Sequence, residues 1–134
     1  MYLATLKEQE KELFLSFAYA LSSSDNDFGT EEHAMIDSYC EEMQFFATDE
    51  ISSMTIEEAV EKIKNISDEK SKKVIIFELV GLALSDSNFD EKEHAIIDEA
   101  SVSFGLDKDY AEKCKKVIEE YLLFQQKINE LVLN

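Results

Sequence analysis

The sequence contains no proline and no arginine, and it has only three glycines, Gly29, Gly81 and Gly105. All-β folds need turn residues every few positions, and this chain does not supply them. Long helices joined by short turns are therefore expected. At 134 residues they should form a single compact helical domain, residues 1–134, around one core. The hydrophobic fraction of 45% argues against wholesale disorder.

Positive charge is scarce. The chain has 30 acidic and 13 basic residues, all of the latter lysine, which gives a net charge of −17. Such a surface repels nucleic-acid backbones and anionic lipid, so we expect neither nucleic-acid binding nor membrane insertion. Cations and proteins with a basic surface are the partners that this charge favours. The alternative is that the acidic excess only keeps the chain in solution.

The two cysteines, Cys40 and Cys114, belong to no CxxC pattern. Both fall on apolar helical faces, which is typical of buried small side chains in a reducing compartment, so a cytoplasmic location is expected. Two apolar runs, residues 13–21 and 74–84, are too short to span a membrane. The segment before the first run carries Glu8, Glu10 and Glu12 rather than the net positive charge of a signal peptide. Both runs are predicted to be core helices.

An internal repeat is visible when the chain is shifted by 61 residues. Residues 24–37 and 85–98 are then identical at eight of fourteen positions, where about one is expected by chance. Each copy is predicted to be a helix, an acidic turn and a second helix, with repeat one at about 6–46 and repeat two at about 67–106. The two copies are expected to be related by a pseudo-twofold axis.

Periodicity and capping residues give the helix boundaries. A capping box at Thr55–Glu58 opens a short linking helix, Ser67 and Asp90 are the expected caps of the two helices of repeat two, and Gly105 ends the last of these. The predicted helices are 6–23, 30–46, 55–65, 67–84, 91–104 and a C-terminal helix at about 108–132, with a short helical turn at 49–54.

The acidic turns carry the candidate site. Helical projection places Asp25 and Asp86 at the end of one apolar stripe, and Glu32 and Glu93 at the start of the next. In each copy an Asp and a Glu therefore meet at the same turn. An Asp at the C-terminal end of a helix also faces the negative end of the helix dipole, so these carboxylates need a compensating partner.

Two interpretations of the turn acids are open. Backbone N–H groups could satisfy them as Asx turns and capping boxes. Alternatively, a divalent cation could be held by these acids together with Asp27, Asn88 and turn carbonyls. The turns are not EF-hands, because the twelfth position counted from each Asp is Ile36 or Ile97 rather than Glu.

The only histidines, His33 and His94, occupy equivalent positions, each four residues before Asp37 or Asp98. A His–Asp pair on one helical turn is therefore expected in each copy. Such a pair is either an ordinary hydrogen bond or part of a mixed nitrogen–oxygen metal site, which makes the histidines secondary candidate ligands. The sequence has no nucleophile–His–acid arrangement, phosphate-binding glycine loop or HExxH motif, so no enzymatic activity is predicted.

The turns resemble those of the TerB-like family, the helical domains associated with tellurite resistance. The resemblance is carried by residues 20–28 with Glu32 and by residues 82–89 with Glu93, and it extends from about residue 13 to residue 106. It implies an all-α domain, a cytoplasmic role in stress resistance, and turn acids that bind metal. The chain departs from the family at Asn26 and Ser87, where the family usually has Gly.

Three functions follow as expectations. The first is a non-enzymatic TerB-like stress module that binds a divalent cation at the turn acids. The second is an acidic protein–protein interaction module without metal, such as a co-chaperone-like adaptor. The third is an acidic mimic of nucleic acid that blocks a DNA-binding protein.

Overall fold

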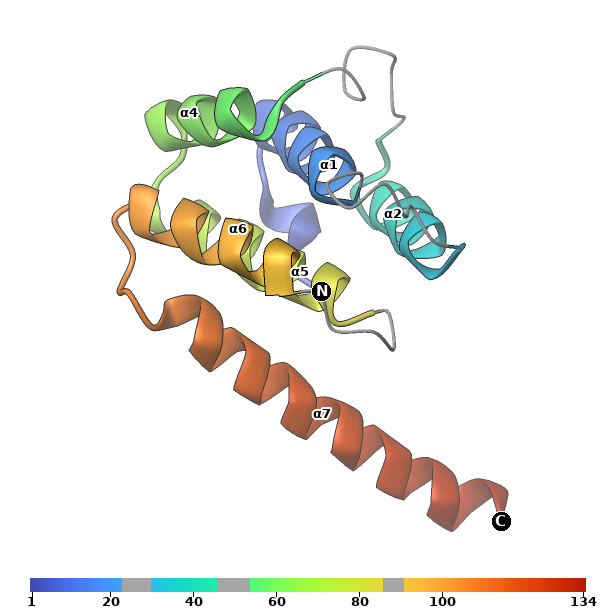
Figure 1. The fold of residues 1–134 in the computed structure, drawn as a ribbon. Helices are drawn as coiled ribbons and strands as arrows, with labels where there is room; N and C mark the ends of the chain where they lie inside the picture. The colour runs from blue at the N-terminus through green and yellow to red at the C-terminus, as the bar shows by residue number, and fades with distance from the viewer. Residues whose placement is uncertain (23–29, 46–53, 86–90) are drawn as a thin grey trace.

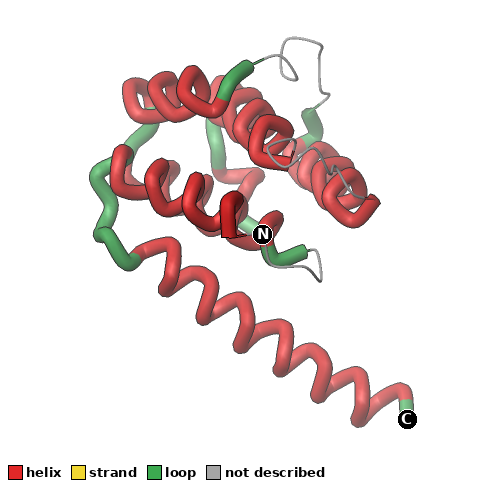
Figure 2. Tube along the Cα trace, in the orientation of Figure 1, coloured by secondary structure: helices red, strands yellow, loops and turns green. Residues whose placement is uncertain are grey.

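Helices and loops make up all of the described chain. The computed structural model describes residues 1–22, 30–45, 54–85 and 91–134, and for residues 30–33 the backbone only. Within these ranges there is no strand (Figure 2), which confirms the expected all-α class. The elements are the 3-10 helix η1 (Leu3–Thr5) and the α-helices α1 (Glu8–Ser22), α2 (Thr30–Met43), α4 (Ile56–Ile66), α5 (Glu69–Ala83), α6 (Glu91–Ser103) and α7 (Tyr110–Leu133).

Helices α1 and α5 are the centre of the packing. Helix α1 contacts α2, α4 and α5, whereas α5 contacts α6, α7 and η1. Helix α7 packs on α5 and α6 through its first half, and its second half runs away from the other helices (Figure 1). Among the described residues, no helix is long and apolar enough to cross a membrane.

The core is built from apolar side chains of every helix. The runs at 13–21 and 74–84 supply much of it, as predicted, because most of their apolar residues are buried. Burying side chains of this size contributes about 1.5–3 kcal/mol each to folding. The largest fully buried side chains are Leu3, Phe14, Leu15, Phe17, Leu21, Ile36, Ile63, Ile75, Ile76, Leu79 and Leu82.

The predicted N-terminal caps are partly right. The Thr55 hydroxyl accepts a hydrogen bond from the backbone N–H of Glu58, as expected for α4. Helix α5, however, is capped by Asp68, whose carboxylate accepts from the Ser71 N–H at 2.8 Å, and the prediction of Ser67 is wrong. Ser67 instead donates its own N–H to the Ile63 carbonyl and so completes α4. The predicted cap Asp90 and the turn at 49–53 lie outside the described residues.

Helices α2 and α6 end in the same way. Gly105 has a φ of 83°, and the Leu106 N–H reaches back to the Ser101 carbonyl, as a glycine stop requires. Gln44 follows α2 with a φ of 52°, and the next N–H bonds the Cys40 carbonyl. Helix α2 therefore ends at Met43 and not at residue 46, because the chain turns left-handed at Gln44.

The described helices recur at the offset of the sequence repeat. Helices α5 and α6 begin 61 residues after α1 and α2, and Gly105 follows Gln44 by the same distance. The pseudo-twofold relation of the two halves remains a prediction.

Gln44 and Gly105 allow a paired stability test. A non-glycine residue in this left-handed conformation is strained by about 1 kcal/mol. We therefore expect Gln44→Gly to raise the free energy of unfolding by about 0.5–1 kcal/mol and Gly105→Ala to lower it by about 1 kcal/mol. A Cβ at Gly105 would meet no atom within 4 Å, so its cost comes from the backbone alone. Urea unfolding followed by circular dichroism measures both changes in the free energy of unfolding. Equal stabilities of the wild type and the two variants would contradict the left-handed conformation at Gln44 and Gly105.

Candidate functional site

Most of the predicted turn ligands lie outside the part of the chain that the structure describes. This holds for Asp25, Asp27, Asp86 and Asn88, and for the side chains of Glu32 and His33. Glu93 and His94 on α6 are the only candidates whose side chains are described. The cation-site hypothesis for the turns therefore remains a prediction.

Glu93 and His94 have different surroundings. Glu93 is only 3% exposed, so it lies on the inward face of α6 as helical projection predicted. His94 Nε2 lies 3.4 Å from Asp98 Oδ2, which confirms the expected His–Asp pair in repeat two, and 3.5 Å from Glu112 Oε2 of α7. Among the described residues, no group of three or more His, Cys, Asp and Glu side chains could hold a metal ion. The His94 contacts therefore connect α6 to α7.

The surroundings of the two thiols favour their protonated form. Cys114 is buried and Cys40 is half-buried, so the prediction of burial is confirmed fully only for Cys114. Burial raises the pKa of both thiols, which keeps them protonated and weakly nucleophilic at neutral pH.

Two carboxylates hold the N-terminal segment against the helices, a contact that was not predicted from the sequence. Glu78 on α5 is 5% exposed and accepts hydrogen bonds from the Met1 amino group at 2.7 Å and from the Tyr2 N–H at 2.9 Å. Glu42 on α2 accepts from the Met1 amino group at 3.1 Å and from the Leu3 N–H at 2.8 Å. Burial alone would lower the pKa of the Met1 amino group, but the two carboxylates outweigh burial and raise it.

An apolar groove lies beside this N-terminal contact. Its volume is about 880 Å³, and it is bounded by the N-terminal segment, α2, α5 and α7. The Tyr39 hydroxyl at its base donates to the Glu78 carbonyl at 3.1 Å, and burial raises the pKa of Tyr39, so this hydroxyl stays neutral. The lining residues are Met1, Tyr2, Met35, Ser38, Tyr39, Glu42, Phe77, Glu78, Gly81, Leu84, Ser85, Val117, Ile118, Tyr121 and Leu122.

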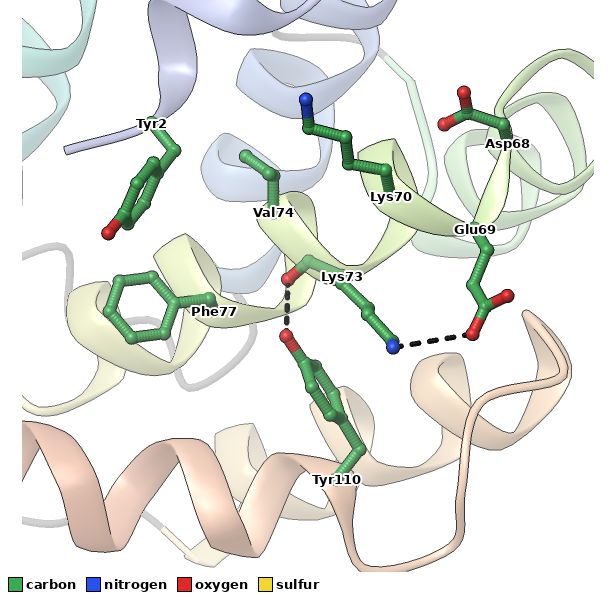
Figure 3. Close-up of a pocket in the computed structure, with 8 residues that line it drawn as sticks. All are labelled: Tyr2, Asp68, Glu69, Lys70, Lys73, Val74, Phe77 and Tyr110. Carbon is green, nitrogen blue, oxygen red and sulfur yellow. Dashed lines mark hydrogen bonds and ion pairs between the residues drawn. The ribbon is translucent and has the colours of Figure 1, made fainter.

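A second hollow of about 700 Å³ shares Tyr2 and Phe77 with the groove. The two rings meet edge to face with centroids 6.0 Å apart, and Figure 3 shows them at one end of the hollow. At the other end Lys73 forms an ion pair with Glu69 at 3.3 Å, and the Tyr110 hydroxyl donates to the Lys73 carbonyl at 2.9 Å (Figure 3). This hollow therefore adjoins the groove at Tyr2 and Phe77, and the groups at its other end already bind one another.

Helix α7 leaves many apolar side chains exposed. Beyond Ile118 its side chains are exposed on all sides, with Phe124 at 63% and Leu131 at 84%. Soluble monomers rarely leave contiguous apolar surface of this extent uncovered, and such surface marks an interaction site. The exposed apolar residues of α7 are Val117, Tyr121, Leu122, Leu123, Phe124, Ile128, Leu131, Val132 and Leu133.

The groove and the exposed half of α7 were not predicted from the sequence. The available signal was the apolar spacing from Val117 to Leu131, which alternates between four and three residues as in a coiled coil. The groove and the exposed apolar residues of α7 together form a candidate protein-binding surface, and the turn acids stay a separate hypothesis. Comparison with protein-family models, with curated proteins and with solved structures found no match to this chain.

Proposed function

We propose that this chain is a non-enzymatic protein-interaction module that binds another protein molecule in the groove between α2, α5 and α7. The observation that carries the proposal is the continuity of the apolar groove with the exposed apolar residues of α7. Removing apolar surface from water is favourable by about 25 cal/mol per Å². A helix or loop laid into the groove would cover Val117, Tyr121 and Leu122 together.

The test compares two substitutions with nearly equal exposure. Val117 in the groove is 56% exposed, and Val102 on α6, outside the groove, is 55% exposed. We expect cross-linking in a cell extract to identify bound proteins that the wild type and Val102→Glu share and that Val117→Glu loses. An unchanged set of bound proteins for Val117→Glu would contradict the proposal.

A second candidate function is the cation-responsive TerB-like stress module. The burial of Glu93 supports it, because an inward-facing carboxylate at the start of α6 is what the acidic turns predict. In this proposal Asp25 and Glu32, and Asp86 and Glu93, hold a divalent cation with turn carbonyls. The net charge of −17 would favour cations and, elsewhere on the surface, a basic protein partner.

Calorimetric titration of metal-free protein with calcium, magnesium, manganese and zinc tests the cation proposal. We expect micromolar binding in the wild type that is lost when Asp25→Asn and Asp86→Asn are combined. Absence of binding, with a melting temperature unchanged by each metal, would mean that the turn acids only cap helices.

A further inference from the structure

The exposed apolar residues of α7 follow the spacing of a coiled-coil seam. Val117, Tyr121, Phe124, Ile128 and Leu131 are separated alternately by four and three residues, and all are at least 44% exposed. This spacing keeps one helical face turned toward a partner helix in a left-handed pair. The seam begins where the contact of α7 with its own domain ends, because the preceding seam position, Cys114, is buried. The surface therefore suits another helix better than an extended peptide.

The charge of α7 identifies the partner. The helix carries four lysines and four glutamates, so it is neutral in a chain of net charge −17. A basic protein would be drawn to the acidic surfaces elsewhere on the domain and not to this helix. A second copy, in contrast, meets little repulsion here, because pairing through α7 brings together two neutral helices rather than the acidic helices α2 and α6 of the two copies.

We propose that the molecule bound in the groove is a second copy of this chain, paired through α7 in antiparallel orientation. This inference rests on the proposed function, in which the groove binds another protein molecule. Antiparallel pairing places Tyr121 opposite Phe124 of the second copy and Val117 opposite Ile128 of the second copy, with the reciprocal contacts across a twofold axis. Only large apolar residues then meet along the seam.

Flanking charges select the antiparallel orientation. Glu120 and Lys127 occupy the same heptad position beside the seam. Antiparallel pairing therefore brings Glu120 of each copy beside Lys127 of the other copy, which gives two such contacts. Parallel pairing in register would instead place Glu120 near Gln125 and Lys127 near Val132, without an opposite charge. The antiparallel pair therefore gains two ion pairs that the parallel pair lacks.

The same pairing fills the groove. The wall of the groove on the α7 side is formed by Val117, Ile118, Tyr121 and Leu122. A helix that lies antiparallel along this wall therefore extends over the mouth of the groove. The end of α7 of the second copy, with Leu131 and its apolar neighbours, then reaches the side formed by α2 and α5. Each copy both fills a groove and offers one, so the interaction closes as a dimer and does not propagate.

Sedimentation equilibrium of the full chain tests the proposal over a wide concentration range. We expect a monomer–dimer equilibrium that Phe124→Glu weakens at least about 30-fold and Val102→Glu leaves unchanged. Each single reversal, Glu120→Lys or Lys127→Glu, should weaken the dimer at low salt, and the two combined in one chain should restore it. Because salt screens these exposed ion pairs, the difference in dimer affinity between the wild type and each single reversal should shrink as the salt concentration rises.

The outcomes separate this inference from the proposed function. A wild-type monomer at every concentration would overturn the inference, and the proposed function would stand if Val117→Glu still loses bound proteins. A dimer that survives both Val117→Glu and Phe124→Glu would overturn the inference, because the copies would then pair elsewhere; the proposed function would fall with it only if Val117→Glu also left the set of bound proteins unchanged. Failure of the combined charge reversal to restore the dimer would overturn the antiparallel orientation. Phe124 is 63% exposed, so its substitution leaves the fold intact, and unchanged far-ultraviolet circular dichroism would verify this.

Discussion

Replacing Phe14 with alanine is expected to lower the free energy of unfolding by about 3–5 kcal/mol, the largest effect predicted for a single side chain here. Phe14 is fully buried in α1, and its ring meets that of Tyr39 edge to face with centroids 5.2 Å apart. The substitution removes this contact and leaves a cavity between α1 and α2, which the surrounding helices can only partly fill.

Urea unfolding followed by circular dichroism measures the loss, and Phe124→Ala is its matched control. Phe124 has the same side chain but is 63% exposed, so in the monomer its removal should change stability by less than about 0.5 kcal/mol. Similar losses for the two variants would contradict the assignment of Phe14 to the core.

Replacing Glu78 with leucine is expected to lower the free energy of unfolding by about 1–3 kcal/mol. The change leaves the Tyr2 N–H without its acceptor and removes one of the two carboxylates that hold the Met1 amino group. Glu61, which is exposed on α4 and lies beyond its capping box, provides the control, because Glu61→Leu breaks no buried contact. Equal stability of the two variants would contradict a structural role for Glu78.

The Met1 contact also predicts a pH dependence. The pKa of the amino group is raised in the folded protein above its ordinary value of 8.0, so folding favours the protonated form. This stabilisation is fully present below pH 8.0 and is lost as the pH rises through the raised pKa. Between pH 7 and pH 10, Glu78→Gln should lose less stability than the wild type, because the amide keeps an acceptor for Tyr2 but carries no charge.

Local signals allowed most of the fold to be predicted. The cap at Thr55 and the stop at Gly105 are set by contacts within a few residues, and the core runs follow from periodicity. The Asp68 cap was missed because Ser67 and Asp68 are both good capping residues, and only the hydrogen bond of Ser67 to α4 decides between them. The short-range part of the structure is thus encoded locally.

The candidate site was harder to predict because its contacts are distant in sequence. Glu78 lies 77 residues from Met1, and nothing near it indicates an amino group as its partner. Helix α7 is apolar on several sides, so its periodicity does not reveal that Ala111 and Cys114 face inward while Leu123 and Phe124 face water. The turn acids were the clearest pattern, and all of them except Glu93 lie beyond the side chains that the structure describes.

The two halves of α7 differ in what keeps them helical. The first half is fixed by its contacts with α5 and α6, whereas the residues after Ile118 have little more than their own backbone hydrogen bonds. An isolated helix of about 15 residues is only marginally stable in water. Amide hydrogens beyond Ile118 should therefore exchange with solvent orders of magnitude faster than those near Cys114 in an isolated molecule. A partner that covers this segment therefore also orders it, and the cost of ordering the helix lowers the net free energy of binding.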